Sequence, residues 1–190
     1  MEKQSPVKEF FSFLGRKGDE LKEYDEMMEY LASEHKGFMV SSSGPSRAAI
    51  SSKHLVQKAK KVIRIFTSEE NFQEDGMYAD MAEWLNDGVS VMIYCENGIG
   101  VGMMNPPENI LVKTATSHFK DAVTKRYKGL CHFITIDDVA YRREYDTNHH
   151  IGVLDFNDPE KTGKLIALFD GHFNGSFRPK RTFWERLQGN

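Results

Sequence analysis

The sequence predicts a single layered α/β domain, with a mixed central sheet flanked by helices. The chain has 190 residues, of which 39% are hydrophobic and 12% aromatic. That is enough for one domain core and too little for two of ordinary size. Short apolar runs alternate with amphipathic segments in the order helices, β-α-β, β-α-β and β-β-α, which is typical of layered α/β domains. The run 89–95 (VSVMIYC) is almost continuously apolar, as in strands covered on both faces.

Residues 1–40 predict an N-terminal helical extension. Apolar side chains recur at helical spacing on both sides of the break at 15–18. These helices either pack on their own domain or form a surface for a partner or a dimer. Phe and Met residues are suited to both roles. Residues 35–44 predict an irregular connection. A helix is expected at 45–60, with Pro45 in the first turn, where proline is tolerated.

Residues 41–175 are expected to form the α/β domain, and 176–190 an irregular C-terminal tail. Strands are predicted at 62–67, 89–95, 110–116, 130–137, 139–145 and 150–156. Helices are predicted at 77–85, at 117–127 with Ser117 as the cap, and from Asp158 onward. Asp137 and Asp138 are expected to make the tight turn between the fourth and fifth strands.

Charge and cysteine usage restrict the class of protein. The formal net charge is −3, so bulk electrostatics favour neither nucleic acid nor an acidic membrane. Cys95 and Cys131 both lie in apolar runs, as do reduced, buried thiols of intracellular proteins. The sequence contains no apolar signal core and no run of about 20 apolar residues, so a cytoplasmic location is expected. The glycines of the loop 98–107 lack the phosphate-binding pattern before a helix, and no cofactor is expected.

Three stretches together resemble a half domain of the phospholipase D-like superfamily. They are HLVQKAKKVIRIFTSEENFQEDGMYADMAEWLNDGVSVMIY (54–94), LCHFITIDD (130–138) and NHHIGVLDFNDPEKTGKLIALFDGHF (148–173). Their order and spacing match that family over residues 45–175. The resemblance implies a site in which a strand histidine attacks phosphorus, a lysine two residues later neutralises phosphate charge, and an aspartate positions the histidine. It also implies that two halves pair to complete one site.

The catalytic motif of that family is largely replaced. With Asp137 at the position of the aspartate, His132 falls at the lysine and Leu130 at the nucleophilic histidine. A second register makes His132 the nucleophile but puts Ile134 at the lysine and Val139 at the aspartate. In the closing strand Asn148 is retained and His150 stands where the family has glutamate. The catalytic candidates carried over by resemblance are His132, Asp137, Asn148 and His150.

The candidate residues also have structural interpretations. Strand alternation places Leu130, His132, Ile134 and Ile136 on one mostly apolar face, where a lone histidine is either a hydrogen-bonded core residue or the remnant of a site. Asp137 has an equivalent explanation as a turn residue. His149 and His150 are adjacent and point to opposite faces of a strand, so no shared metal site is expected.

The leading functional hypothesis is a catalytically degenerate domain that works by binding, as a homodimer, in a regulatory or inhibitory role. Its partner is a protein or a phosphodiester-bearing molecule such as DNA. The alternative is an active phosphodiesterase or nuclease with an altered site centred on His132, and a third hypothesis is an assembly protein that uses the N-terminal helices. The candidate phosphate- or nucleic-acid-binding residues are Lys58, Lys60, Lys61, Arg64, Lys125 and Arg126.

Overall fold

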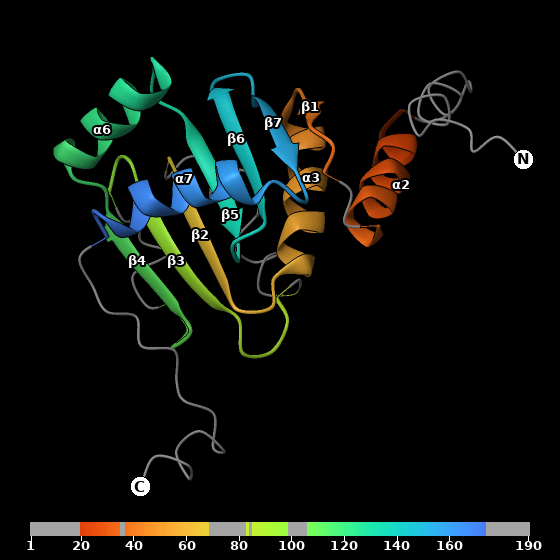
Figure 1. Ribbon diagram of the computed structural model, residues 1–190, viewed down its shortest axis with the longest axis horizontal. Coiled ribbons are helices and arrows are strands. Elements are labelled where there is room, and N and C mark those ends of the chain that lie inside the picture. The colour runs from red at the N-terminus through yellow and green to blue at the C-terminus, as the bar shows by residue number, and fades with distance from the viewer. Residues whose placement is uncertain (1–19, 35–36, 69–82, 84, 99–105, 174–190) are drawn as a thin grey trace, which may run out of the picture.

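A seven-stranded mixed sheet with helices on both faces forms the body of the protein (Figure 1). The computed structural model describes residues 20–34, 37–68, 83, 85–98 and 106–173. The helices are α2 (Glu20–Ser33), α3 (Pro45–Lys58), α6 (Ser117–Tyr127) and α7 (Pro159–Asp170). The strands are β1 (Val40–Ser42), β2 (Val62–Thr67), β3 (Ser90–Cys95), β4 (Ile110–Thr114), β5 (His132–Ile136), β6 (Ala140–Asp146) and β7 (Ile151–Asp155).

The sheet changes character at β2. The strand order is β1-β7-β6-β5-β2-β3-β4. On one side of β2, strands β3 and β4 run parallel to it. On the other side β5, β6, β7 and β1 continue as an antiparallel meander closed by the first strand. This arrangement confirms the predicted α/β class with a mixed sheet.

Two separate cores cover the two faces of the sheet. Alternation along β2 sends Ile63 and Ile65 to one face and Phe66 to the other. The first face packs under α2 and α3, and the second packs under α6 and α7 in an aromatic cluster that includes Phe119 and Phe169. Every residue of β3 is buried because helices cover both of its faces, as its apolar run predicted.

The strand β1 corrects the prediction that residues 35–44 are irregular. Val40 pairs with Leu154, and Ser42 with Gly152, in antiparallel register at the edge of the sheet. The segment lacks an apolar alternation because Ser42, which is fully buried, faces a charged side chain in the interior. Its strand conformation therefore depends on pairing with a strand more than 100 residues later in the chain.

The helices begin near their predicted positions with one change of cap. Thr116, not Ser117, caps α6, because its side-chain oxygen accepts from the backbone N–H of Phe119 at 3.1 Å. Asp158 caps α7 as its position predicted, with Pro159 in the first turn. Of the helix predicted at 77–85, only residues 83 and 85 are described, and the first of the two predicted N-terminal helices lies outside the described residues.

The second predicted N-terminal helix, α2, shares the core of the domain. It packs against α3, where the hydroxyls of Tyr24 and Ser51 are 2.8 Å apart and His54 Nε2 lies 2.6 Å from Asp25 Oδ1. Neither cysteine forms a disulfide, and both are buried, in cores on opposite faces of the sheet. None of the described helices is long and apolar enough to cross a membrane.

Close approach of β6 and β7 makes Gly152 a sensitive position. A Cβ at Gly152 would lie 2.5 Å from the backbone oxygen of Arg143, so Gly152→Ala must push the two strands apart. We expect a loss of about 2 kcal/mol or more in the free energy of unfolding, measured by urea denaturation. Gly163→Ala on the exposed side of α7 meets no atom within 4 Å and is the matched control. It should stabilise the protein by about 0.5–1 kcal/mol, and equal effects of the two substitutions would contradict this account.

Candidate functional site

A polar cluster lies where the carboxyl ends of β2 and β3 meet the beginning of β5. Ligands of open α/β sheets bind at carboxyl strand ends where the direction of strand addition reverses, and β2 is that point here. Because β5 runs antiparallel to β2, with Phe133 opposite Phe66, its first residue lies beside the last residues of β2. That first residue is His132, and Glu96 follows directly after β3.

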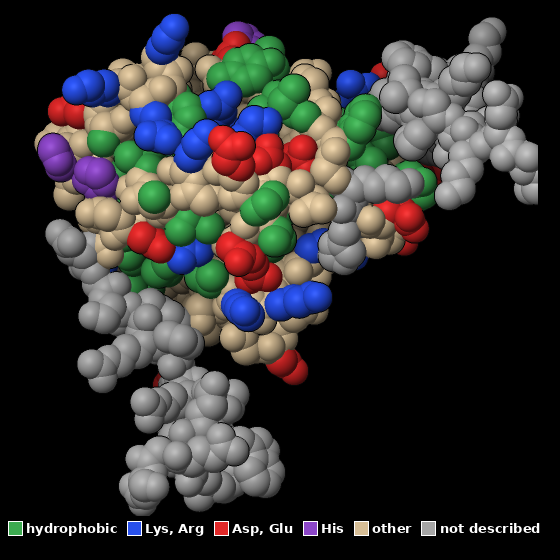
Figure 2. Space-filling model, in the orientation of Figure 1, with side chains coloured by type: hydrophobic (Ala, Val, Ile, Leu, Met, Phe, Trp, Pro, Cys, Tyr) green, Lys and Arg blue, Asp and Glu red, His purple; other side chains and the backbone are tan. Residues whose placement is uncertain are grey.

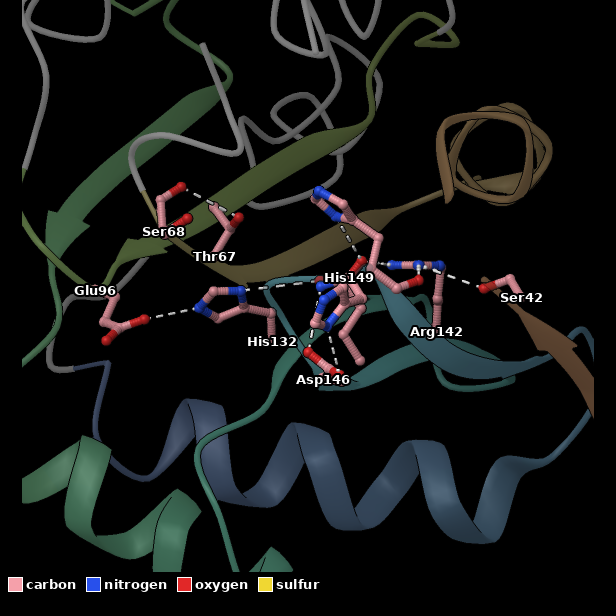
Figure 3. A network of polar contacts seen from close by, with 10 residues as sticks. Ser42, Thr67, Ser68, Glu96, His132, Arg142, Asp146 and His149 are labelled. Atoms are coloured by element: carbon pink, nitrogen blue, oxygen red, sulfur yellow. Dashed lines mark hydrogen bonds and ion pairs between the residues drawn. The ribbon is translucent and has the colours of Figure 1, made fainter. Parts of the chain in front are cut away.

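His132 is held between two carboxylates. Its Nε2 is 2.8 Å from Glu96 Oε2, and its Nδ1 is 3.9 Å from Glu144 Oε2. Figure 3 shows the imidazole of His132 and the carboxylate of Glu96 pointing toward each other, from the start of β5 and the end of β3, the strands on either side of β2. The edge of Phe66 closes one side of the imidazole, with ring centroids 5.4 Å apart. The His132 side chain is only 6% exposed, so the ring is positioned firmly and has little access to solvent.

A buried ion pair anchors the second carboxylate. Arg142 and Glu144 lie two apart on β6 and therefore on the same face, and Arg142 Nη1 donates to Glu144 Oε1 at 2.6 Å. Both side chains are almost fully buried. The other amino group of the guanidinium donates to Ser42 Oγ and to the carbonyl oxygen of His150, each at 3.4 Å (Figure 3). The ion pair thus ties β6 to the edge strand β1 and to the β6–β7 turn.

The hydrogen bond to His132 lowers the pKa of Glu96. Burial acts in the opposite direction, and the charges of His132 and Lys120 lower the pKa further. Glu96 is therefore a carboxylate over the ordinary pH range. An acceptor held 2.8 Å from the imidazole stabilises a proton on Nε2 and keeps that nitrogen occupied.

The hollow beside this cluster is small. It measures about 30 Å³ and lies between α3 and the sheet, bordered by Ser52, Thr67, His132 and Glu144. Pockets that enclose organic ligands usually measure about 300–1,000 Å³. The hollow has room for a water-sized molecule and none for a phosphodiester group.

The β6–β7 turn brings one of its two histidines to the cluster. His150, with φ of 52°, directs Nδ1 toward Glu144 Oε1 at 3.4 Å. Its neighbour His149 points away and binds the carboxylate of Asp146 at 2.9 Å (Figure 3). Asn148 lies exposed in the same turn. The two adjacent histidines therefore diverge, as their spacing predicted.

Asp137 lies at the opposite end of β5 from His132, roughly 15 Å away at the usual rise per residue of a strand. Its carboxylate accepts three backbone N–H bonds, from Lys60, Lys61 and Val62, at 2.9–3.0 Å. Its φ of 51° is in the left-handed region that Asp tolerates in turns. These contacts agree with the turn interpretation and bring Asp137 nowhere near the histidine cluster.

Leu130 does not share the face of His132. The strand begins at His132, because the chain leaves α6 through the left-handed residue Lys128 and only then enters the sheet. Leu130 packs with the aromatic core under α6 and α7. The alternation predicted from residue 130 is therefore wrong for Leu130 and holds from residue 132 onward.

The basic residues predicted to bind phosphate lie in separate places. Lys58, Lys60 and Lys61 surround the amino end of β2, whereas Lys125 and Arg126 end α6 just before β5, at the opposite end of the sheet. Arg64 is engaged by Asp170 of α7 through two hydrogen bonds of 2.7 and 2.9 Å. The basic residues at 178–181 lie outside the described residues. Figure 2 shows Lys, Arg, Asp and Glu side chains intermingled on the face covered by α7.

Sequence reasoning missed Glu96, Arg142 and Glu144. Glu96 comes directly after an apolar strand, the position at which polar side chains of α/β sheets gather, and that signal was available. Arg142 and Glu144 are charged residues with strand spacing inside a predicted hairpin, a pattern usual for solvent-facing strands. Across the described residues, no group of three or more His, Cys, Asp or Glu side chains has the arrangement of a metal site.

Comparison with known proteins supports the fold. No protein-family model matches the sequence, and no curated protein is similar to it. Among solved structures, NucT from Helicobacter pylori superposes with a TM-score of 0.52 at 13% identity, over 72% of this chain and 96% of NucT. The chain therefore shares the α/β fold of NucT. TrmBL2, an archaeal chromatin protein described as having a novel mode of DNA binding, gives a TM-score of 0.45 at 12% identity, over 90% of this chain and 64% of TrmBL2. That second value is too low to carry an argument.

The three N–H bonds to Asp137 predict a structural effect of its removal. Asp137→Ala should lower the free energy of unfolding by about 2 kcal/mol, because three donors lose their acceptor and alanine disfavours the left-handed backbone. Asp138→Ala, at an exposed turn position, is the control and should change it by less than about 0.5 kcal/mol. Chemical denaturation of both variants measures the difference. Equal stabilities would contradict the capping role.

The lowered pKa of Glu96 predicts how stability depends on pH. A carboxyl whose pKa is lower in the folded state stabilises the fold above its ordinary value of 4.5, and this contribution is lost as the pH falls through the lowered pKa. Glu96→Gln should therefore be less stable than the parent near neutral pH, with a gap that narrows in acid. Urea unfolding at a series of pH values measures the gap, with Glu29→Gln on the exposed side of α2 as control. A gap independent of pH would rule out this linkage.

Proposed function

We propose that this chain is a catalytically degenerate phospholipase D-like domain that acts by binding, in a regulatory or inhibitory role, as a homodimer. The observation that carries the proposal is the engagement of His132, whose two ring nitrogens face Glu96 and Glu144. A histidine that attacks phosphorus needs one nitrogen free and open to the substrate. Here the ring is buried beside a hollow of about 30 Å³.

The charge of the cluster also favours binding over phosphoryl chemistry. Phosphoryl transfer needs cations aimed at the phosphate oxygens. Among the described residues, the guanidinium of Arg142 is paired with Glu144, His132 contacts the carboxylate of Glu96, and Lys120 Nζ lies 3.4 Å from the backbone carbonyl oxygen of Glu96. A phosphodiester would have to compete with these carboxylates for the cations.

The homodimer rests on resemblance, because single halves of this superfamily pair to complete a two-fold site. Sedimentation velocity of the full chain tests it directly. A species of twice 21.8 kDa is expected, and a monomer at all concentrations would remove this part of the proposal.

Hydrolysis assays test the absence of catalysis. The purified full chain is incubated with bis(p-nitrophenyl) phosphate and with single- and double-stranded DNA, and we expect no turnover above the rate without protein. DNA binding is measured on the same preparations to separate a phosphodiester-bearing partner from a protein partner.

His132→Ala is the companion variant for these assays. Turnover by the parent that disappears in folded His132→Ala would overturn the proposal and make the chain a phosphodiesterase with a rebuilt site. Because His132 is buried, His132→Gln is prepared as well, since its amide keeps a polar contact with Glu96 if the alanine variant fails to fold.

A further inference from the structure

A second hollow lies at the other end of the sheet from His132. It measures about 350 Å³, within the size range of ligand sites, and opens between the ends of α2 and α3 and the β5–β6 turn. We call it the lysine groove, after the three lysines that border it, Lys58, Lys60 and Lys61. Figure 1 shows that the end of α3 and the beginning of β2 meet at the end of the domain away from the β6–β7 turn.

The inside of the lysine groove is apolar. Ala32, Ile136, Ala140 and Phe156 line it and belong to the buried core, so their side chains form a fixed floor. Val139 stands at the edge with 37% of its surface exposed, an apolar side chain held outward by the turn. The four floor residues are only 1–3% exposed, so the apolar surface that a ligand's side chain can cover here is that of Val139.

The three lysines at the border of the groove are positively charged and have no protein partner among the described residues. Within the described part of the chain, none of the three lysine side chains takes part in a hydrogen bond or an ion pair. Two carboxylates are also present, but that of Asp137 is occupied by three backbone N–H groups. The second carboxylate is that of Asp138, at the turn. The groove is thus lined by three positive and two negative side chains, and the excess of positive charge favours a negative ligand.

We infer that the lysine groove is a docking site for an acidic polypeptide segment of a partner protein, with an apolar side chain placed against Val139 at its edge. The lysines attract the carboxylates of the segment, and the contact with Val139 distinguishes a peptide from a free ion. The site is separate from the His132 cluster, so the inference stands whether or not that cluster hydrolyses phosphodiesters.

The groove suits a polypeptide better than a nucleic acid. Single-stranded nucleic acid binds through exposed aromatic faces that stack on bases. The aromatic side chain of the groove, Phe156, is 3% exposed and offers no such face. Duplex DNA needs cations spread along its backbone, whereas these three lysines lie within four residues of one another.

A peptide titration of the ¹⁵N-labelled full chain tests the inference at low ionic strength. The probe is a short Asp/Glu-rich peptide with a central Leu-Phe pair. Its controls are the same peptide with Ser-Ser at the centre and a Lys-rich peptide with the same Leu-Phe pair. We expect the acidic Leu-Phe peptide to shift the amide signals of residues 58–62 and 138–140, and both control peptides to bind more weakly.

Variants that change the charge of the groove should change its affinity for the acidic peptide in a predicted direction. Lys60→Glu/Lys61→Glu should weaken binding of the acidic Leu-Phe peptide about tenfold or more, and Lys125→Glu/Arg126→Glu, with the same change of charge at the other end of the sheet, should not. Asp138→Asn should tighten binding, because it removes the carboxylate at the turn. Thermal unfolding checks that each variant is folded.

Several results would overturn the inference. They are no binding of the acidic peptide, equal binding by the Lys60/Lys61 variant, signal shifts outside the groove, and displacement of the peptide by duplex DNA at lower concentration. The last result would assign the lysines to nucleic acid. Phosphodiester turnover in the separate assays would alter the proposed function of the His132 cluster and leave the peptide result unchanged.

Discussion

The buried ion pair between Arg142 and Glu144 is the constraint on which the rest of this structure depends. Two charges inside a protein cost free energy unless each is paired and its remaining hydrogen-bonding groups are satisfied. Here the guanidinium also reaches Ser42 on the edge strand and the carbonyl of His150, and the carboxylate faces His132 and His150. The requirement to satisfy this pair positions the first strand, the β6–β7 turn and the histidine in one arrangement.

The two ends of the sheet consequently offer different chemistry. At the carboxyl end of β2, carboxylates surround an imidazole beside a hollow with room for about one water. At the amino end, three lysines without an ion-pair partner among the described residues border a larger groove. The His132 cluster at the first end and the docking groove inferred at the second are therefore separate sites. Fold alone therefore does not locate the function.

Sequence patterns predicted elements well where burial on one or two faces sets the residue types. The apolar run ending in Cys95 marked β3, and the β-rich residues of 62–67 marked β2. The patterns failed where a partner distant in the chain decides the conformation. Ser42 of β1 faces the side chain of Arg142. Thr116, and not Ser117, caps α6 because the backbone of Thr116 is extended and its side chain accepts from the N–H of Phe119. The candidate site followed the same division, with His132 recognised and its partners Glu96 and Glu144 missed.

By itself the sequence predicted the α/β class, the buried thiols and the turn at Asp137, and the structure confirms all three. Each of these follows from residue type and spacing along a short segment. The tertiary structure alone decided that His132 lies between two carboxylates, that Asp137 caps the start of β2 far from that histidine, and that the basic residues divide between two ends of the sheet. Those features depend on which strands are neighbours, and neighbouring strands here come from segments separated by as many as 114 residues, as in the pairing of Val40 with Leu154.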